Sequence, residues 1–248
     1  MTKLSVNINK IATLRNARGG DLPNVLKAAV DCQAFGADGI TVHPRPDQRH
    51  ITKKDAFDLK SVITTEYNIE GYPSKDFIKM VLEISPDQVT LVPDAVDVIT
   101  SDSGWDTITH NSFLKEIITE FKANGIRTSI FVNPEVKIIE GAKLCGTDRI
   151  ELYTEDYASR YSEDKNQAIS PYLAAAEKAL EYDLKINAGH DLNLNNLGFF
   201  VDNINPVSEV SIGHALISDA IYLGLENRIQ MYKRLLWCFL EFMVKGKQ

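Results

Sequence analysis

The 248-residue chain lacks the features that define several large classes of protein. Its three cysteines, Cys32, Cys145 and Cys238, are too few and too widely spaced for a disulfide framework or a zinc motif, so we expect a reducing, cytoplasmic environment. No apolar run reaches the ~18 residues of a membrane span, and the N-terminus has no signal-peptide core. The patterns G-x-G-x-x-G and G-x-x-x-x-G-K-[ST] are also absent, which disfavours an open nucleotide-binding sheet.

Positive charge is in deficit, with 27 lysines and arginines against 34 aspartates and glutamates and a net charge of -7. Because the two signs are interspersed, we expect no general affinity for nucleic acid or anionic membranes. A local basic cluster is therefore informative. One follows the first hydrophobic run, in NINKIATLRNARGG (7–20), where Lys10, Arg15 and Arg18 stand among amides and glycines. We interpret this stretch as a loop that binds an anion.

Short β-branched runs alternate with longer amphipathic segments along the chain. The predicted strands cover 4–8, 39–43, 67–70, 88–92, 127–132, 149–153, 185–189 and 209–213. The predicted helices lie near 22–35, 53–65, 74–84, 111–124, 134–144, 168–183, 193–203 and 214–224. This alternation implies parallel βαβ units, and eight of them favour an α/β fold of the closed (β/α)8 TIM-barrel type, one domain over residues 1–248. An open doubly wound sheet is the alternative.

The segment 226–246 predicts an extra C-terminal helix with a wide apolar face. That face comprises Ile229, Leu235, Leu236, Phe239, Leu240 and Met243. The helix packs either on its own barrel or against another subunit, and the sequence leaves both open.

Polar residues gather where the predicted strands end, which is where a parallel barrel builds its active site. The residues at or just after these ends are Asn7, Asn9, His43, Arg45, Glu70, Glu151, His190, Gly213 and His214. Four of the five histidines, His43, His50, His190 and His214, lie there, which favours function over a structural role.

Glu70 ends a strand with apolar neighbours, and we expect its confined carboxyl to have a raised pKa suited to a base near neutral pH. A purely structural pairing with Arg45 is the alternative. Gly71 would allow backbone or ligand to approach closely. In GITVHPRPDQRHI, two prolines would hold His43, Arg45 and His50 in a fixed loop.

Two stretches, INAGHDL and SIGHAL, share a strand, a glycine and a histidine before a predicted helix. Such turns direct backbone N–H groups at a ligand, and barrels often bind phosphate after strands seven and eight. With Arg15 and Arg18 on the first loop, the sequence predicts two separated anion sites.

The segment 92–111 is long for a connection in this fold. It is either a lid that brings Thr100 or Ser101 to a ligand, or a decorative insertion. A metal site is disfavoured, because no H-x-H or H-E-x-x-H pattern occurs and basic residues share the same end of the barrel.

Seven stretches carry a resemblance to a known family: VNINKIATLRNARGG, GADGITVHPRPDQRHI, NIEGYPS, VTLVPDA, IELYT, INAGHDLN and SIGHALI. In order and across nearly the whole chain, they resemble the pyridoxine 5'-phosphate synthases of the deoxyxylulose-dependent vitamin B6 pathway. The resemblance implies a transferase that condenses 3-amino-2-oxopropyl phosphate with 1-deoxy-D-xylulose 5-phosphate to give pyridoxine 5'-phosphate, inorganic phosphate and water. It implies no metal or organic cofactor, and a homo-octamer in which the C-terminal helix leans toward subunit contact.

Residue roles follow from the resemblance. Glu70 and His43 would transfer protons, His190 would act as acid toward departing oxygen, and Glu151 would support charge in the transition state. The predicted contacts to the amino ketone phosphate are Asn7, Arg18, Gly213 and His214. The predicted contacts to the deoxyxylulose phosphate are Arg45, His50 and Thr100.

The chain departs from the family pattern at two places. Asn9 and Lys10 stand where many members have Asp-His, and Asp191 stands where many have glycine. All three remain predicted substrate contacts, Asn9 to a sugar hydroxyl and Lys10 to an anion.

Two rival functions stay open. One is a metal-dependent sugar-phosphate isomerase or aldolase on the same barrel. The other is a phosphometabolite-binding barrel without catalysis, although no expected proton-transfer residue is missing.

Overall fold

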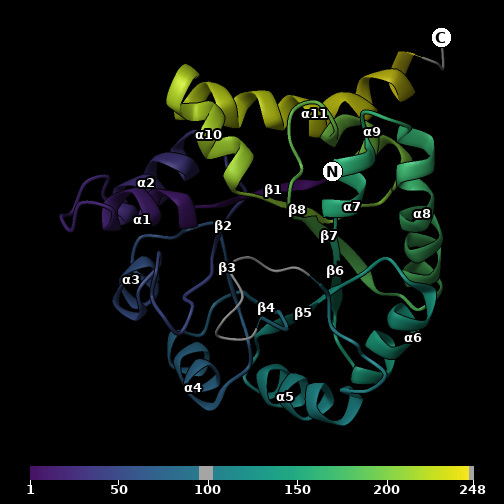
Figure 1. Cartoon of the computed structure of the whole chain (residues 1–248), viewed down its shortest axis with the longest axis horizontal. Coiled ribbons are helices and arrows are strands. Elements are labelled where there is room, and N and C mark those ends of the chain that lie inside the picture. Colours follow the sequence, from purple (N-terminus) through teal and green to yellow (C-terminus); the bar gives the residue numbers. More distant parts are fainter. Residues whose placement is uncertain (95–102, 246–248) are drawn as a thin grey trace.

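The computed structural model describes residues 1–94 and 103–245, with side chains described as far as residue 237. Eight parallel strands close into a barrel in the order of the sequence, and helices surround it (Figure 1). The predicted (β/α)8 barrel is confirmed. The strands are β1 (Lys3–Asn7), β2 (Gly39–Val42), β3 (Glu66–Gly71), β4 (Gln88–Leu91), β5 (Arg127–Val132), β6 (Arg149–Tyr153), β7 (Lys185–Gly189) and β8 (Glu209–Ile212).

Eleven helices occur in the described part of the chain. They are α1 (Asn9–Asn16), α2 (Val25–Ala34), α3 (Lys53–Leu59), α4 (Lys75–Ile84), α5 (Asn111–Ala123), α6 (Val136–Cys145), α7 (Glu155–Arg160), α8 (Lys165–Glu181), α9 (Leu197–Asn203), α10 (His214–Leu223) and α11 (Leu225–Lys245). Side chains fix several helix starts by accepting bonds from first-turn N–H groups, among them Asn24 on α2, Ser74 on α4 and Asp164 on α8.

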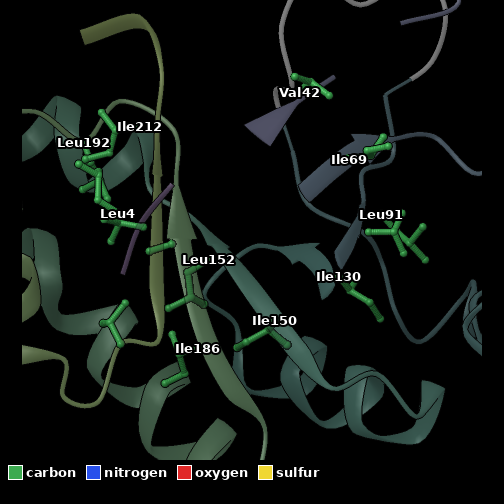
Figure 2. Close-up of a cluster of buried hydrophobic side chains, with 14 of the residues drawn as sticks. Leu4, Val42, Ile69, Leu91, Ile130, Ile150, Leu152, Ile186, Leu192 and Ile212 are labelled. Atoms are coloured by element: carbon green, nitrogen blue, oxygen red, sulfur yellow. The ribbon is translucent and has the colours of Figure 1, made fainter. Parts of the chain in front are cut away.

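The apolar core lies between the sheet and the helices. Successive strand residues point to opposite faces, and the set that faces the helices is apolar and buried. Figure 2 shows part of this core, with Leu4, Val42, Ile69, Leu91, Ile130, Ile150, Leu152, Ile186 and Ile212 contributed by all eight strands. This shell holds the barrel closed and leaves the inward-facing positions available for polar residues.

The inward-facing residues form two polar groups below the mouth of the barrel. A middle row joins Ser5, Thr41, Asn68, Thr90 and Glu151 through side-chain hydrogen bonds of 2.6 to 3.5 Å. A lower cluster at the amino ends of the strands comprises Lys3, Glu66, Arg127, Arg149 and Glu209.

Within the lower cluster, Lys3 lies 3.1 Å from Glu66, and Arg127 also pairs with that carboxylate. Arg149 Nη1 lies 3.5 Å from Glu209 Oε2 and donates to Asn187 Oδ1 at 3.1 Å. The barrel interior is thus a hydrogen-bonded polar column.

Helix boundaries differ from the sequence prediction at several places, among them α3, which ends at Leu59 rather than near 65. The stretch predicted as the first loop contains α1, and α7 was not predicted at all. Helix α8 begins at Lys165 rather than 168, and α9 begins at Leu197 rather than 193. The sequence did not predict α1, because its many polar residues leave only a weak apolar face. In the structure Ala12 and Arg15 are nevertheless buried.

The C-terminal helix α11 contacts α9, α10, α2 and β1, and Figure 1 shows it lying along that side of the barrel. Ile229, Tyr232 and Leu236 are buried, so this part of the helix packs on its own barrel. The predicted face residues Phe239, Leu240 and Met243 lie beyond the described side chains. Subunit contact through α11 therefore stays a prediction.

A search of the described helices for one long and apolar enough to cross a membrane finds none. The two candidate lid residues, Thr100 and Ser101, lie outside the described residues.

Candidate active site

One cavity of about 600 Å³ opens at the carboxyl ends of the strands. Twelve residues predicted from the sequence line it: Asn7, Asn9, Lys10, His43, Arg45, His50, Glu70, Glu151, His190, Asp191, Gly213 and His214. Two are not placed there. Arg18 is exposed on the turn after α1 and does not line the cavity, and Thr100 lies outside the described part of the chain.

Two carboxyl groups, Glu70 from β3 and Glu151 from β6, face the cavity from its floor. Burial, with the nearby charge of Glu151, raises the pKa of Glu70 well above its usual range. Burial raises the pKa of Glu151 to about 7, although the Thr90 hydroxyl and His190 act against that rise. Asn7 Nδ2 donates to Glu70 Oε2 at 3.4 Å. The Glu151 carboxyl can therefore hold or release a proton near neutral pH, and the Glu70 carboxyl favours its protonated form more than an exposed glutamate does.

Gly189 leaves room for the Glu151 carboxyl. A Cβ atom at Gly189 would lie 2.4 Å from Glu151 Oε1, so any larger residue at the end of β7 would displace the carboxyl. Gly71 was expected to let backbone or ligand approach closely. In the structure the Phe77 ring packs there instead, and a Cβ atom at position 71 would lie 2.2 Å from that ring.

His43 and His50 line the cavity from the loop after β2 and are kept neutral. Burial, followed by the charges of His50 and Arg45, lowers the pKa of His43 to about 3. Burial, followed by the charges of Lys10 and Arg45, lowers the pKa of His50 to about 4. At neutral pH both rings are uncharged, and each can donate one N–H hydrogen bond.

The loop that carries these histidines is anchored on both sides. Asn9 Oδ1 accepts a hydrogen bond from the His43 backbone N–H at 2.9 Å, so part of Asn9 serves the fold. His50 Nδ1 accepts from the Ile51 N–H at 2.9 Å, which leaves Nε2 as the protonated nitrogen of the neutral ring. Arg45 is buried and pairs with Asp94 at 2.9 Å.

The sequence interpretation of Arg15 as an anion-binding group is wrong. Arg15 is buried in α1 and pairs with Asp55 through both guanidinium nitrogens, at 2.6 and 2.8 Å. Its Nη2 also donates to the His50 carbonyl at 3.3 Å. Arg15 therefore fastens α1 to α3 and to the His50 loop, a buried role that the charge pattern alone could not distinguish from ligand binding.

One of the two turns predicted to bind an anion places a helix N-terminus at the cavity. Helix α10 begins at His214 directly after Gly213, without a side-chain cap, and its first residues line the cavity. Its free N–H groups and positive dipole end favour a phosphate there. The turn after β7 differs, because α9 begins only at Leu197 and its N-terminus is not part of the cavity wall.

His190 and Asp191 form this turn after β7 and contact each other. His190 Nδ1 lies 2.8 Å from Asp191 Oδ2, and the edge of the imidazole meets the Tyr153 ring with centroids 4.9 Å apart. The Thr154 hydroxyl donates to the His190 carbonyl and fixes the backbone. Both residues line the cavity.

Four residues missed by the sequence analysis support the site: Thr90, Asp94, Tyr153 and Ser211. Three of them occupy strand positions of the same inward parity as Glu70 and Glu151. Polar residues alternating with apolar ones inside predicted strands were the available signal. Among the side chains of residues 1–94 and 103–237, no group of three or more from His, Cys, Asp or Glu is arranged to hold a metal ion.

A closed parallel barrel with titratable groups and a helix N-terminus at its mouth is the architecture of TIM-barrel enzymes. The family model of pyridoxal phosphate biosynthesis protein PdxJ matches residues 4–237, and the chain belongs to this family.

Its relatives extend over almost the whole chain. It is 64% identical to the pyridoxine 5'-phosphate synthase of Flavobacterium johnsoniae over 232 residues, 94% of this chain and 98% of that protein. It is also 64% identical to that of Christiangramia forsetii, covering 95% of this chain and 100% of the relative. The phosphoribosylanthranilate isomerase of Thermotoga maritima shares the fold alone, with a TM-score of 0.59 and 14% identity over 95% of this chain and 98% of that one.

Proposed function

We propose that this chain is a pyridoxine 5'-phosphate synthase that condenses 3-amino-2-oxopropyl phosphate with 1-deoxy-D-xylulose 5-phosphate. The products are pyridoxine 5'-phosphate, inorganic phosphate and water, and we assign the reaction to the transferases. The proposal rests on the gathering of Glu70, Glu151, His43 and His190 around one cavity, in a chain that belongs to this family.

Each step of the condensation requires a proton to move. The amine and ketone of the two substrates form an imine, carbons then lose protons, phosphate leaves, and ring closure releases water. We assign carbon deprotonation to Glu70 and His43. Burial and neighbouring positive charge lower the pKa of His43 to about 3, so its ring is unprotonated before the step. His190 protonates departing oxygen, and Glu151 faces the positive charge of the intermediates.

Phosphate recognition provides the positioning. We assign the amino ketone phosphate to the α10 N-terminus, through Gly213 and His214, with Asn7 beside it. We assign the deoxyxylulose phosphate to Arg45 and His50. Holding both substrates in one cavity makes their reaction effectively unimolecular. By the effective-molarity argument, this lowers the activation free energy of the condensation by ~7 kcal/mol or more.

Five assignments rest chiefly on the resemblance. Arg18 and Thr100 remain proposed substrate contacts, and Lys10, Asn9 and Asp191 line the cavity in place of the commoner residues. We propose cytoplasmic location and a homo-octamer, for which exposed Ile221 and Tyr222 at the end of α10 provide apolar surface. Light scattering on the purified protein measures the mass of the assembly.

The direct test supplies both substrates to purified, chelated protein and measures release of inorganic phosphate, with the second product identified by mass. Wild type should yield pyridoxine 5'-phosphate, and Glu70→Gln should lower kcat by ~100-fold or more because it removes a proton-transfer group. A fold check by circular dichroism accompanies the variant. Absence of product from wild type under chelated and metal-supplemented conditions would refute the proposed function.

A further inference from the structure

The turn that follows β7 has an unusual backbone. His190 and Asp191 have φ angles of +83° and +61°, so two successive residues with side chains occupy the left-handed region. This conformation is unfavourable for L-residues, and it persists only where the surroundings enforce it. Here it turns the Asp191 carboxylate back onto the imidazole of the preceding residue.

The loop itself does not depend on that carboxylate. The backbone carbonyl of Asp191, not its side chain, accepts the amide bonds of Asn193 at 3.4 Å and Asn196 at 3.2 Å. Asn196 Oδ1 in turn accepts from the Asn193 N–H at 2.8 Å. The Asp191 side chain is left to bond His190 Nδ1 at 2.8 Å.

Titratable groups from three segments of the chain surround the His190–Asp191 pair. Asp191 adjoins the His190 ring on the same turn, Glu151 approaches from β6, and His214 lies near Asp191 at the start of α10. The Tyr153 ring, also from β6, packs against the imidazole edge. The hydrogen bond to His190 lowers the pKa of Asp191, so this carboxylate is ionised at neutral pH.

We propose that Asp191 is a positioning residue for His190: its carboxylate holds the proton on Nδ1, aims Nε2 into the cavity and stabilises the imidazolium. A neutral ring bonded in this way carries its proton on Nδ1, and a charged ring can then lose only the Nε2 proton without breaking the contact. The surroundings of His190 are thus opposite to those of His43, which faces positive charge.

The catalytic consequence rests on the proposed function. As a carbon–oxygen bond breaks, its electron pair goes to the departing oxygen, and His190 transfers its Nε2 proton to that oxygen. The ring remains neutral with Nδ1–H bonded to Asp191, and it regains a proton from solvent before the next turnover.

The first measurement is an NMR titration of the histidine rings in the free enzyme, with His190→Gln to assign the signal. Asp191→Asn should lower the pKa of His190 by about 1 unit, because an ionised partner at hydrogen-bond distance is lost. Asp191→Gly, which accepts positive φ without strain, should do the same. Asp47→Asn, on the loop after β2, is the matched control and should leave the His190 titration unchanged.

The second measurement is the pH profile of kcat. In Asp191→Asn its alkaline limb should move to lower pH by the same amount, giving about a tenfold loss at pH 8. An unchanged His190 titration in both Asp191 variants would overturn the inference even if activity fell. If the titration shifts but the wild-type protein makes no product, the inference about the His190–Asp191 pair stands and the proposed function is refuted.

Discussion

The two ends of the barrel interior both bury a pair of glutamates, and their surroundings differ. At the amino ends of the strands, Glu66 pairs with Lys3 and Arg127, and Glu209 faces Arg149. At the carboxyl ends, Glu70 and Glu151 line the cavity, and among the described residues no lysine or arginine forms an ion pair with either. The same residue type thus belongs to a closed ionic network at one end and to a reactive site at the other.

Cavity volume does not distinguish the two ends of the barrel. A cleft of about 610 Å³ lies beside the amino ends, lined in part by Arg127 and Arg149, and is as large as the cavity at the mouth. Burial raises the pKa of Glu209 strongly too, with the charge of Glu66 adding to the effect. What differs is the counter-charge, because guanidinium groups stabilise the lower glutamates, whereas the upper ones remain available to a substrate.

The largest expected effect comes from breaking the lower cluster with Arg149→Met. The change leaves Glu66 and Glu209 buried beside fewer cations, and it should lower the free energy of unfolding by about 3 kcal/mol, as measured in urea. The kcat of the folded fraction should change less than about twofold, because no group at the mouth is touched.

Lys185→Met is the matched control for Arg149→Met. Lys185 pairs in register with Arg149 on the neighbouring strand and is exposed, so its loss should change the free energy of unfolding by less than about 0.5 kcal/mol. Similar losses in both variants would mean that the lower cluster stabilises the fold no more than surface charge does.

Glu151→Gln tests the upper end and should have the opposite sign. The folded pKa of about 7 lies above the unfolded value near ~4.3, so the stability contributed by the protonated carboxyl is present at low pH and lost as pH rises through 7. Gln should therefore stabilise the fold by about 2 kcal/mol at pH 8 and by much less at pH 4, while lowering kcat. Urea unfolding at both pH values measures this, and equal changes at the two would contradict a raised pKa.

The sequence was sufficient for the strands, because eight apolar runs with turn residues between them admit few arrangements other than a barrel. The mouth followed from the fold, since parallel strands bring His43, Glu70 and His190 to one end. The predictions of a loop at 7–20 and of an anion bound by Arg15 were wrong. The same basic sequence is expected whether the guanidinium binds a ligand or pairs with Asp55, which is distant in the sequence.

The polar interior also escaped prediction. Thr90 and Asn68 sit within runs that were assigned to strands by their apolar neighbours, and their bonds join strands distant in the sequence. Only the register of the closed sheet shows that they form one row leading to Glu151. The smallest expected effect concerns this row.

Thr90→Val keeps the side-chain shape and removes the hydroxyl that bonds Asn68 at 3.1 Å and Glu151 at 3.5 Å. It should cost about 1 kcal/mol of stability. Because the Thr90 bond lowers the pKa of Glu151, its loss should raise that pKa further, so the acidic limb of the kcat profile moves to higher pH and activity recovers near pH 8.5.

Thr41→Val removes a buried hydroxyl from the same row without touching Glu151, and should reproduce the stability loss alone. An equal shift of the acidic limb in both variants would mean that the row affects activity only through the stability of the barrel. The difference between the two ends would then not depend on the hydrogen bond from Thr90 to Glu151.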